Sequence, residues 1–422
     1  MHQSTLLNNG IQVISERMDT VRSVSLGAWF RVGSRDELPG QYGLSHFMEH
    51  MFFKGTNKRD ALTISQDFES LGAEQNAFTS KEYTCYYARM VDEKLPAVFE
   101  VLSDMLTGSL FEQKSIDSER EVVIEEIARS EDTPDDYVFE LFSEALFPGH
   151  PLGRQIAGSR QSVSAFMHAD CERYRQQHYH TGNCIIVACG NVAHEQLVEL
   201  VERYFATLPQ GEAAQRGEAP AKTPGSLKLL QKETEQAHLV YGMPGVALGD
   251  ADRFAAKLLD AALGGGMSSR LFQEIREKRG LVYAVYATTI SYINAGSFLV
   301  YAGTRPEKLA EVVSLVRLEL QRLLAAGMSA DELQRMKDYL IGTLVLGMES
   351  TANRMMRIGR SAVADQEMLG LDELIGRYQA VSLEQTRQVA ERVLAAEPTL
   401  AVISPNAPEQ LREVLAGAMA AD

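Results

Sequence analysis

The sequence predicts an α+β protein of two homologous domains, each a mainly antiparallel β-sheet flanked by helices. Three observations predict this fold: the length of the chain, a linker-like stretch near its middle, and an internal repeat. A chain of 422 residues is too long for one ordinary core, because single hydrophobic cores stop growing at about 250 to 300 residues. We therefore expect two domains of about 200 residues each.

The stretch from Leu208 to Ser226 has the composition of a linker. It contains three Pro, three Gly and few large apolar side chains, which is typical of a segment that connects two cores. We expect an N-terminal domain over residues 1–210, a linker over 211–226 and a C-terminal domain over 227–422.

The two halves match each other when the second is aligned on the first at one constant offset. Glu93-Lys94-Leu95 matches Glu307-Lys308-Leu309, and Ile127 then matches Ile341 without a gap. In each half, hairpin-like strand pairs are followed by runs of helices, which favours α+β domains. The predicted strands are Ile11–Glu16, Val24–Val32, Tyr83–Val91, Cys184–Gly190, Leu227–Lys232, His238–Met243, Leu281–Ile290, Ser297–Gly303 and Leu400–Ile403.

Composition and charge narrow the class of protein. The chain is 45% apolar and 23% charged, as in ordinary globular proteins, and no apolar run approaches the roughly 20 residues of a membrane span. The start lacks the basic and apolar regions of a signal peptide, so we expect a cytoplasmic protein. The net charge of −16 argues against nucleic-acid binding and is compatible with basic partners. The four cysteines form no disulfide or zinc pattern, and Cys184 and Cys189 lie in an apolar run that predicts buried thiols.

The segment from Leu44 to Phe52 contains a candidate metal site. Its apolar residues have helical spacing, and His46 and His50 share the other face, one turn apart, where two imidazoles can bind a single ion. Glu49 stands beside them in an HxxEH arrangement. Catalytic zinc takes three protein ligands and keeps one open position, so the motif predicts a third ligand elsewhere, with Glu49 as the general base.

A helix predicted over Ile116–Arg129 supplies two candidates for the third ligand. Glu119 and Glu126 fall on its apolar side, whereas Glu125 points away. Two carboxylates on a core-facing surface are costly to bury without a cation or hydrogen-bond donors. Helical geometry excludes Glu125 but leaves Glu119 and Glu126 both open.

The repeat indicates that the site occurs once per chain. At the same offset, His46, His50, Glu119 and Glu126 correspond to residues that do not form a metal site. The equivalents of the two glutamates are leucines, as expected for ordinary core positions. The corresponding residues are Asp260, Gly264, Leu333 and Leu340.

These residues resemble those of the pitrilysin-type metallopeptidases, the inverzincins, and most closely the half-size members akin to the β-subunit of the mitochondrial processing peptidase. The similarity covers essentially the whole chain. It is densest in GLSHFMEHMFFKGT, LGAEQNAFTSKEYTCYY, SEREVVIEEI, HPLGRQIAG and MSSRLFQEIREKRGLVYAV. The family pattern implies that Glu126 is the third zinc ligand and that Glu119 is a further active-site glutamate. It implies one zinc ion per chain and a zinc metalloendopeptidase activity.

The resemblance also implies residues that bind the substrate. Arg276 and Tyr283 match an Arg–Tyr pair with which the second domain holds the substrate and helps to stabilise the developing charge. Asn76, Ala77 and Phe78 match an edge strand to which an extended peptide adds by main-chain hydrogen bonds.

The expected partners follow from the same comparison. Two chains, or a duplicated one, would enclose a chamber that admits peptides or unfolded segments, with basic ones favoured by the negative charge. Because this chain carries both the metal motif and the Arg–Tyr pair, we expect a homodimer rather than a heterodimer with a partner that has no site. The alternative is a non-catalytic core subunit of a protein complex, against which the retained His46, Glu49, His50 and Glu126 argue.

Overall fold

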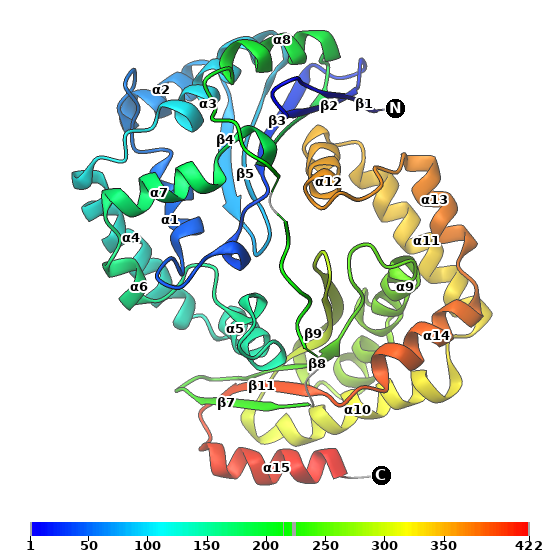
Figure 1. Cartoon of the computed structure of the whole chain (residues 1–422). Helices are drawn as coiled ribbons and strands as arrows, with labels where there is room; N and C mark the ends of the chain where they lie inside the picture. Colours follow the sequence, from blue (N-terminus) through cyan, green and yellow to red (C-terminus); the bar gives the residue numbers. More distant parts are fainter. Residues whose placement is uncertain (1, 214, 222–224, 421–422) are drawn as a thin grey trace. The chain divides into compact units, whose positions relative to one another are not determined.

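The computed structural model describes residues 2–213, 215–221 and 225–420. Contacts between Cα atoms divide the chain into two compact units (Figure 1). The first unit contains residues 1–128, 154–217 and 346–370, and the second contains 129–153, 218–345 and 371–422. Each unit is therefore built from segments of both halves of the sequence.

The first unit contains a six-stranded sheet with the order β1-β2-β6-β3-β5-β4. Strands β2 and β6 are parallel, and the other neighbours are antiparallel. The strands are β1 (His2–Leu6), β2 (Gln12–Arg17), β3 (Ser23–Phe30), β4 (Glu74–Thr79), β5 (Thr84–Val91) and β6 (Cys184–Gly190). The helices are α1 (Leu44–Met51), α2 (Ala61–Ser70), α3 (Leu95–Gly108), most of α4 (Gln113–Glu131), α6 (Arg160–Ser164), α7 (His168–His178), α8 (His194–Tyr204) and α12 (Thr351–Val363).

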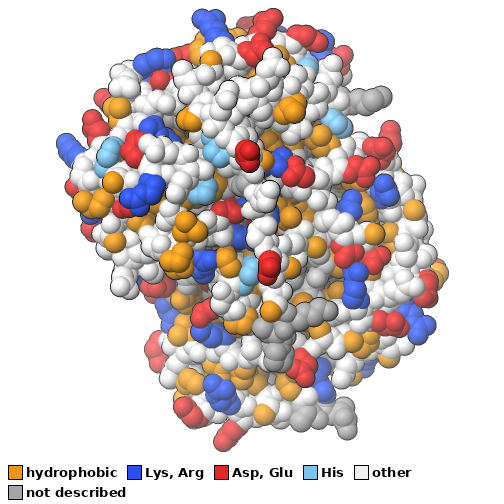
Figure 2. All heavy atoms as spheres, viewed as in Figure 1, with side chains coloured by type: hydrophobic (Ala, Val, Ile, Leu, Met, Phe, Trp, Pro, Cys, Tyr) orange, Lys and Arg blue, Asp and Glu red, His pale blue; other side chains and the backbone are white. Residues whose placement is uncertain are grey.

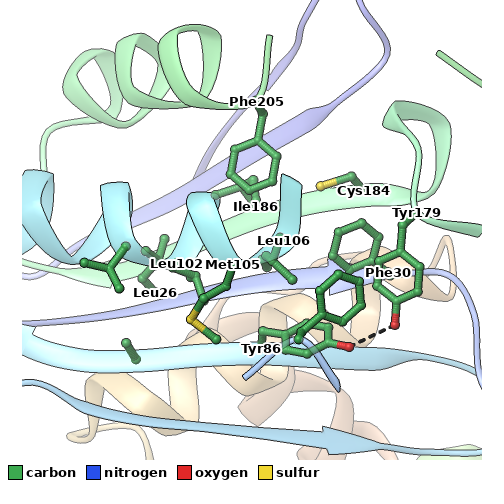
Figure 3. Close-up of a cluster of buried hydrophobic side chains, with 14 of the residues drawn as sticks. Leu26, Phe30, Tyr86, Leu102, Met105, Leu106, Tyr179, Cys184, Ile186 and Phe205 are labelled. Atoms are coloured by element: carbon green, nitrogen blue, oxygen red, sulfur yellow. Dashed lines mark hydrogen bonds between the residues drawn. The ribbon is translucent and has the colours of Figure 1, made fainter. Parts of the chain in front are cut away.

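The main core of this unit lies on one face of the sheet. Strand β3 turns Leu26 and Phe30 toward this core, and α3 covers them with apolar side chains (Figure 3). The hydroxyl groups of Tyr86 and Tyr179 hydrogen-bond to each other at 2.9 Å inside the core, which satisfies two polar groups that would otherwise be costly to bury.

The opposite face of the same sheet is covered by α12, although α12 comes from the second half of the sequence. Trp29 alternates with its core-facing neighbours on β3 and is fully buried against Met355 and Ile358 of α12. A hydrogen bond of 2.9 Å between Ser25 Oγ and Thr351 Oγ1 fixes the start of the helix.

The second unit contains a five-stranded sheet with the order β7-β11-β8-β10-β9. Strands β7 and β11 are parallel, and the other neighbours are antiparallel. The strands are β7 (Leu227–Gln231), β8 (Ala237–Pro244), β9 (Val282–Ser291), β10 (Gly296–Thr304) and β11 (Thr399–Ser404). The helices are α5 (Pro134–Leu146), α9 (Arg253–Gly264), α10 (Leu309–Ala326), nearly all of α11 (Ala330–Gly347), α13 (Leu371–Ala380), α14 (Leu383–Leu394) and α15 (Pro408–Ala420).

The two units repeat one arrangement, as the sequence offset predicts. Strand β3 begins at Ser23 and β8 begins at Ala237, which is the residue that the offset assigns to Ser23, and the two strands occupy equivalent places in their sheets. Helix α5 lies before the second unit in sequence, yet it packs on β8 and β11, while its counterpart α12 packs on β3 and β6. In each copy of the repeat, the equivalent helix therefore packs on the sheet of the other copy.

The fold class is confirmed: both sheets are mainly antiparallel and flanked by helices. All nine predicted strands are present, with ends that differ by at most two positions. Strand β1 was not predicted, because a short exposed strand has no apolar alternation. Residues 270–277 are helical, with a π-helical segment at Phe272–Glu277.

The predicted linker begins as an ordered segment of the first unit. Arg216 donates hydrogen bonds to the Asp36 carboxylate and to the Glu82 carbonyl, and the carbonyl of Gly217 accepts one from Arg35 at 3.3 Å. Residues 214 and 222–224 lie outside the described part. The division into domains at 1–210 and 227–422 stays a prediction, since the units exchange α5 and α12.

No helix within the described ranges is both long and apolar enough to cross a membrane. All four cysteines are buried and unpaired, as predicted for Cys184 and Cys189.

The contact between α12 and Trp29 generates a stability prediction. A Cβ atom added at Gly359 would lie 2.1 Å from the Trp29 ring, so Gly359→Ala should lower the free energy of unfolding by about 1 to 3 kcal/mol through overpacking. Thermal unfolding measures this effect. The matched control is Gly376→Ala in α13, where an added Cβ meets no atom within 4 Å and the helix should gain up to about 1 kcal/mol. Equal midpoints for the two variants would contradict the contact.

Candidate active site

Helix α1 is anchored on its apolar face and at its first turn. The carboxylate of Glu37 accepts hydrogen bonds from the backbone amides of Gly43 at 2.9 Å and Ser45 at 2.8 Å, which satisfies free donors of the helix N-terminus. Gly43 has φ of 94° and an added Cβ would lie 2.5 Å from the Ala157 carbonyl oxygen, so only glycine fits at this entry. The buried residues of α1 are Leu44, Ser45, Phe47, Met48 and Met51.

The opposite side of α1 brings His46 and His50 next to Glu126 of α4. Glu126 Oε2 lies 3.5 Å from His50 Nε2 and 3.7 Å from His46 Nε2, and one ligand atom from each residue lies within 4.8 Å of the others. Ligand atoms around a tetrahedral zinc ion are about 3.3 Å apart, given bonds of about 2.0 to 2.1 Å. These three side chains therefore fit a zinc ion, and they are the only such cluster in the part of the chain that the structure describes.

The pKa values of the two imidazoles shift in opposite directions. Burial and the neighbouring His50 lower the pKa of His46 to about 4, so His46 is neutral at pH 7 and has a free lone pair. Burial lowers the pKa of His50, but the hydrogen bond to Glu119 and the negative charges of Glu126 and Glu49 outweigh it and raise the pKa. A cation bound beside His50 would therefore lie near the carboxylates of Glu49, Glu119 and Glu126.

The two glutamates of α4 differ in burial, which corrects the expectation that both lie in the apolar stripe. Glu119 is 4% exposed, whereas the Glu126 side chain is 45% exposed, and Val122 on the same side is also 45% exposed. The buried face of α4 is narrower than the predicted apolar side and is made up of Ile116, Glu119, Val123 and Ile127. The energetic cost of burying a carboxylate therefore applies only to Glu119. Glu126 is supported as the third metal ligand by its short distances to the two imidazoles.

Glu119 binds the ring nitrogen of His50 that faces away from Glu126. His50 Nδ1 lies 2.7 Å from Glu119 Oε1, and Lys54 Nζ lies 2.5 Å from Glu119 Oε2. Burial raises the pKa of Glu119, but the hydrogen bonds from His50 and Lys54 outweigh it and hold the pKa below its ordinary value. A carboxylate in this position holds an imidazole with its proton on Nδ1 and its lone pair on Nε2.

Glu49 lies on α1 between the two histidines and accepts a hydrogen bond from the neighbouring strand. Thr79, the last residue of edge strand β4, donates from Oγ1 to Glu49 Oε2 at 2.5 Å. Burial raises the pKa of Glu49, more than the Thr79 hydrogen bond and the nearby His50 lower it. The base candidate is thus held between the histidine helix and the end of the sheet edge.

The predicted peptide-binding segment forms this edge strand. Strand β4 is the outermost strand of the first sheet and pairs only with β5 among the described strands. Asn76 is exposed, and its side chain accepts a hydrogen bond of 2.8 Å from the Ala77 amide. Phe78 packs edge to face on Trp29 with ring centroids 5.8 Å apart. Because the Phe78 ring is packed inward, the parts of β4 that remain accessible at the edge are its main chain and the side chains that alternate with Phe78.

Arg276 and Tyr283 belong to the second unit. The Arg276 guanidinium lies 5.3 Å from the centroid of the Tyr283 ring and 4.8 Å from that of Phe272, and Tyr283 is 78% exposed. The structure therefore brings the pair together as a cation–π contact within one unit. Their predicted part in substrate binding stays a prediction.

The second copy is built so that it cannot form the same cluster. Asp260, at the position of His46, is buried and accepts hydrogen bonds from the amide and hydroxyl of Thr289, both at 2.8 Å. A Cβ at Gly264, the position of His50, would lie 2.1 Å from the Ala287 nitrogen. Helix α9 is too close to β9 for a side chain there.

Three residues that support the site were not predicted: Glu37, Lys54 and Thr79. Thr79 contacts Glu49 and Lys54 contacts Glu119 across long stretches of sequence, whereas Glu37 contacts amides six and eight residues further along the chain. Lys54 lies three residues beyond the end of α1, so helical periodicity reveals none of the three.

Known proteins with similar sequences are peptidases. Residues 12–160 match the family model described as insulinase (peptidase family M16), and residues 165–340 match the one described as the peptidase M16 inactive domain. An uncharacterized zinc protease of Streptomyces coelicolor is 42% identical and covers 95% of this chain and 89% of its own length. The uncharacterized zinc protease YmxG of Bacillus subtilis is 38% identical over 94% of this chain and 97% of its own length.

Solved structures agree in fold. A peptidase M16 inactive domain from Pseudomonas fluorescens has a TM-score of 0.91 at 22% identity and covers 96% of this chain and 98% of its own. A protease from Helicobacter pylori has a TM-score of 0.87, also at 22% identity, over 96% and 100%.

The fold, the cluster and these relatives define the class as zinc metallopeptidases. Within that class, the chain belongs to peptidase family M16, the pitrilysin-type family, among its half-size members.

The anchor of α1 generates a prediction for pH. Burial raises the pKa of Glu37 to about 7, despite the hydrogen bonds from Ser45 and Gly43 and the charge of Arg154. Because the folded-state pKa lies above the unfolded-state value, stability present at pH 4.5 is lost as the pH rises through 7. From pH 5 to 8, the wild type should therefore lose up to about 3 kcal/mol relative to Glu37→Gln.

Urea unfolding of both proteins in EDTA, at several pH values, measures this difference without a contribution from metal binding. A stability difference that stays constant with pH would contradict the buried, titrating Glu37.

Proposed function

We propose that this chain is a zinc-dependent endopeptidase, with zinc held by His46, His50 and Glu126 and with Glu49 as the general base. The observation that carries the proposal is the geometry of the cluster: two imidazoles and one carboxylate have ligand atoms within 4.8 Å of one another, with the carboxylate 3.5 and 3.7 Å from the two imidazoles, and Glu49 lies on the same helix as both histidines. Three protein ligands leave one position open, as in catalytic rather than structural zinc sites.

The division of work between the residues follows from their chemistry. When bound, zinc polarises the scissile carbonyl and makes a water molecule more acidic. The Glu49 carboxylate takes a proton from the attacking water and delivers it to the leaving amine nitrogen. Thr79 keeps one carboxylate oxygen of Glu49 oriented, and Glu119 holds His50 in the tautomer that a metal requires.

The substrate in this proposal is an extended peptide that adds to the edge of β4. The exposed Asn76 side chain covers the Ala77 amide, and a peptide carbonyl would take its place. Because such pairing uses main-chain groups, it favours an extended conformation over a particular sequence. An unfolded segment meets this requirement, and a folded domain does not.

Further parts of the proposal depend on the resemblance to the family. We place Arg276 and Tyr283 on the substrate, in a homodimer whose chains enclose a chamber. A preference for basic peptides would follow from the net charge of −16. Figure 2 shows Asp and Glu mixed with Lys and Arg over the face in view, so the charge forms no single acidic patch on that face.

The match to an inactive domain does not favour the alternative of a non-catalytic core subunit. That match covers residues 165–340, whereas the cluster and Glu49 lie within 12–160, the region that matches the peptidase model. The match is consistent with a second copy that has no site.

The first test separates the base from the ligands. Glu49→Gln should bind one zinc ion per chain, as the wild type does, because no ligand is lost. It should lose cleavage of an unstructured peptide by about 10²-fold to 10⁴-fold, the usual contribution of a general base. Metal analysis and a fluorogenic peptide assay measure both, and a variant that remains fully active would show that Glu49 is not the base.

The second test addresses the third ligand. Glu126→Gln should weaken zinc binding by more than about 100-fold, the upper end for residues that only orient a ligand. The matched control is Glu125→Gln, which changes an exposed neighbour on the same helix and should leave zinc affinity unchanged. Equal affinities for the two variants, measured by chelator competition, would move the ligand to another residue.

A further inference from the structure

A lysine just after α1 completes a chain of contacts that ends at the metal cluster. Lys54 Nζ lies 2.5 Å from Glu119 Oε2, and Glu119 Oε1 lies 2.7 Å from His50 Nδ1. His50 in turn presents Nε2 to Glu126 at 3.5 Å. Lys54 and His50 therefore bind the two oxygens of the same carboxylate, one each.

The burial of Glu119 makes both partners necessary. Its side chain is 5% exposed, and a buried carboxylate is costly unless its charge is paired and its oxygens accept hydrogen bonds. Without Lys54, Oε2 would lose its positively charged partner, and the carboxylate could rotate about its terminal bond, whose torsion is broad. Rotation would carry Oε1 away from His50.

We propose that Lys54 is a positioning residue for the metal centre: it fixes the Glu119 carboxylate, which in turn orients the His50 ring toward the metal. This inference rests on the proposed function, because it assumes that His50 is a zinc ligand. Lys54 itself touches neither metal nor substrate in this account. Its effect should therefore appear in zinc affinity, as for other residues that hold a ligand from behind.

A nearby lysine provides the matched control. Lys58 is 62% exposed and pairs with Glu100 at 3.2 Å and Asp104 at 3.6 Å, away from Glu119. Lys54 is 32% exposed. Both substitutions to glutamine remove one surface-accessible positive charge, so a difference between them reports the contact with Glu119 and not the net charge.

The experiment compares the wild type with Lys54→Gln, Lys54→Arg and Lys58→Gln as full chains. Zinc affinity is measured by competition with a chromophoric chelator, and thermal midpoints are measured for the metal-free proteins. We expect Lys54→Gln to weaken zinc binding by at least about 10-fold, Lys54→Arg to recover most of that loss, and Lys58→Gln to have no effect.

The outcomes separate this inference from the proposed function. A wild type that binds no zinc would remove the proposed function. A wild type that binds zinc, with Lys54→Gln binding within about twofold of it, would overturn only the role of Lys54. A lower thermal midpoint with unchanged zinc affinity would assign Lys54 a structural role and would also overturn the inference.

Discussion

The placement of α1 is the constraint on which the site depends. This helix is only eight residues long, and isolated helices of that length are not stable in water. Its position therefore comes from tertiary contacts: a buried apolar face and the Glu37 carboxylate at its first turn. With one face held in the core, the helical period leaves His46 and His50 together on the other. The cluster is a consequence of how the helix is buried.

The repeat explains why one copy can carry the site and the other cannot. Both copies place a helix against the edge of a sheet, but the approach differs. In the second unit, Gly264 allows α9 to lie against the backbone of Ala287, and Asp260 bonds to Thr289. The position that His46 occupies in the first copy is occupied by Asp260 in the second. There the side chain joins the helix to the neighbouring strand instead of facing a metal. The exchange of α5 and α12 ties each sheet to a helix from the other copy.

Much of this could be predicted from the sequence, because the responsible signals are local or periodic. Apolar alternation located the strands, and the constant offset between the halves located the repeat. The spacing of His46, Glu49 and His50 indicated a metal site. Helical geometry left Glu119 and Glu126 open, and the assumed burial of Glu126 was wrong, since its side chain is 45% exposed. Contacts made by Thr79 and Glu37 depend on the folded chain, and no periodicity encodes them.

The most direct test of the central claim is a crystal structure of the zinc-loaded protein with anomalous scattering measured at the zinc edge. We expect one strong peak per chain, bonded to Nε2 of His46, Nε2 of His50 and a carboxylate oxygen of Glu126 at about 2.0 to 2.2 Å. Glu49 should lie beside the metal without binding it, and Glu119 should remain on His50 Nδ1. A peak bonded to Glu119 instead of Glu126, or located away from α1, would show that these residues do not form the zinc site.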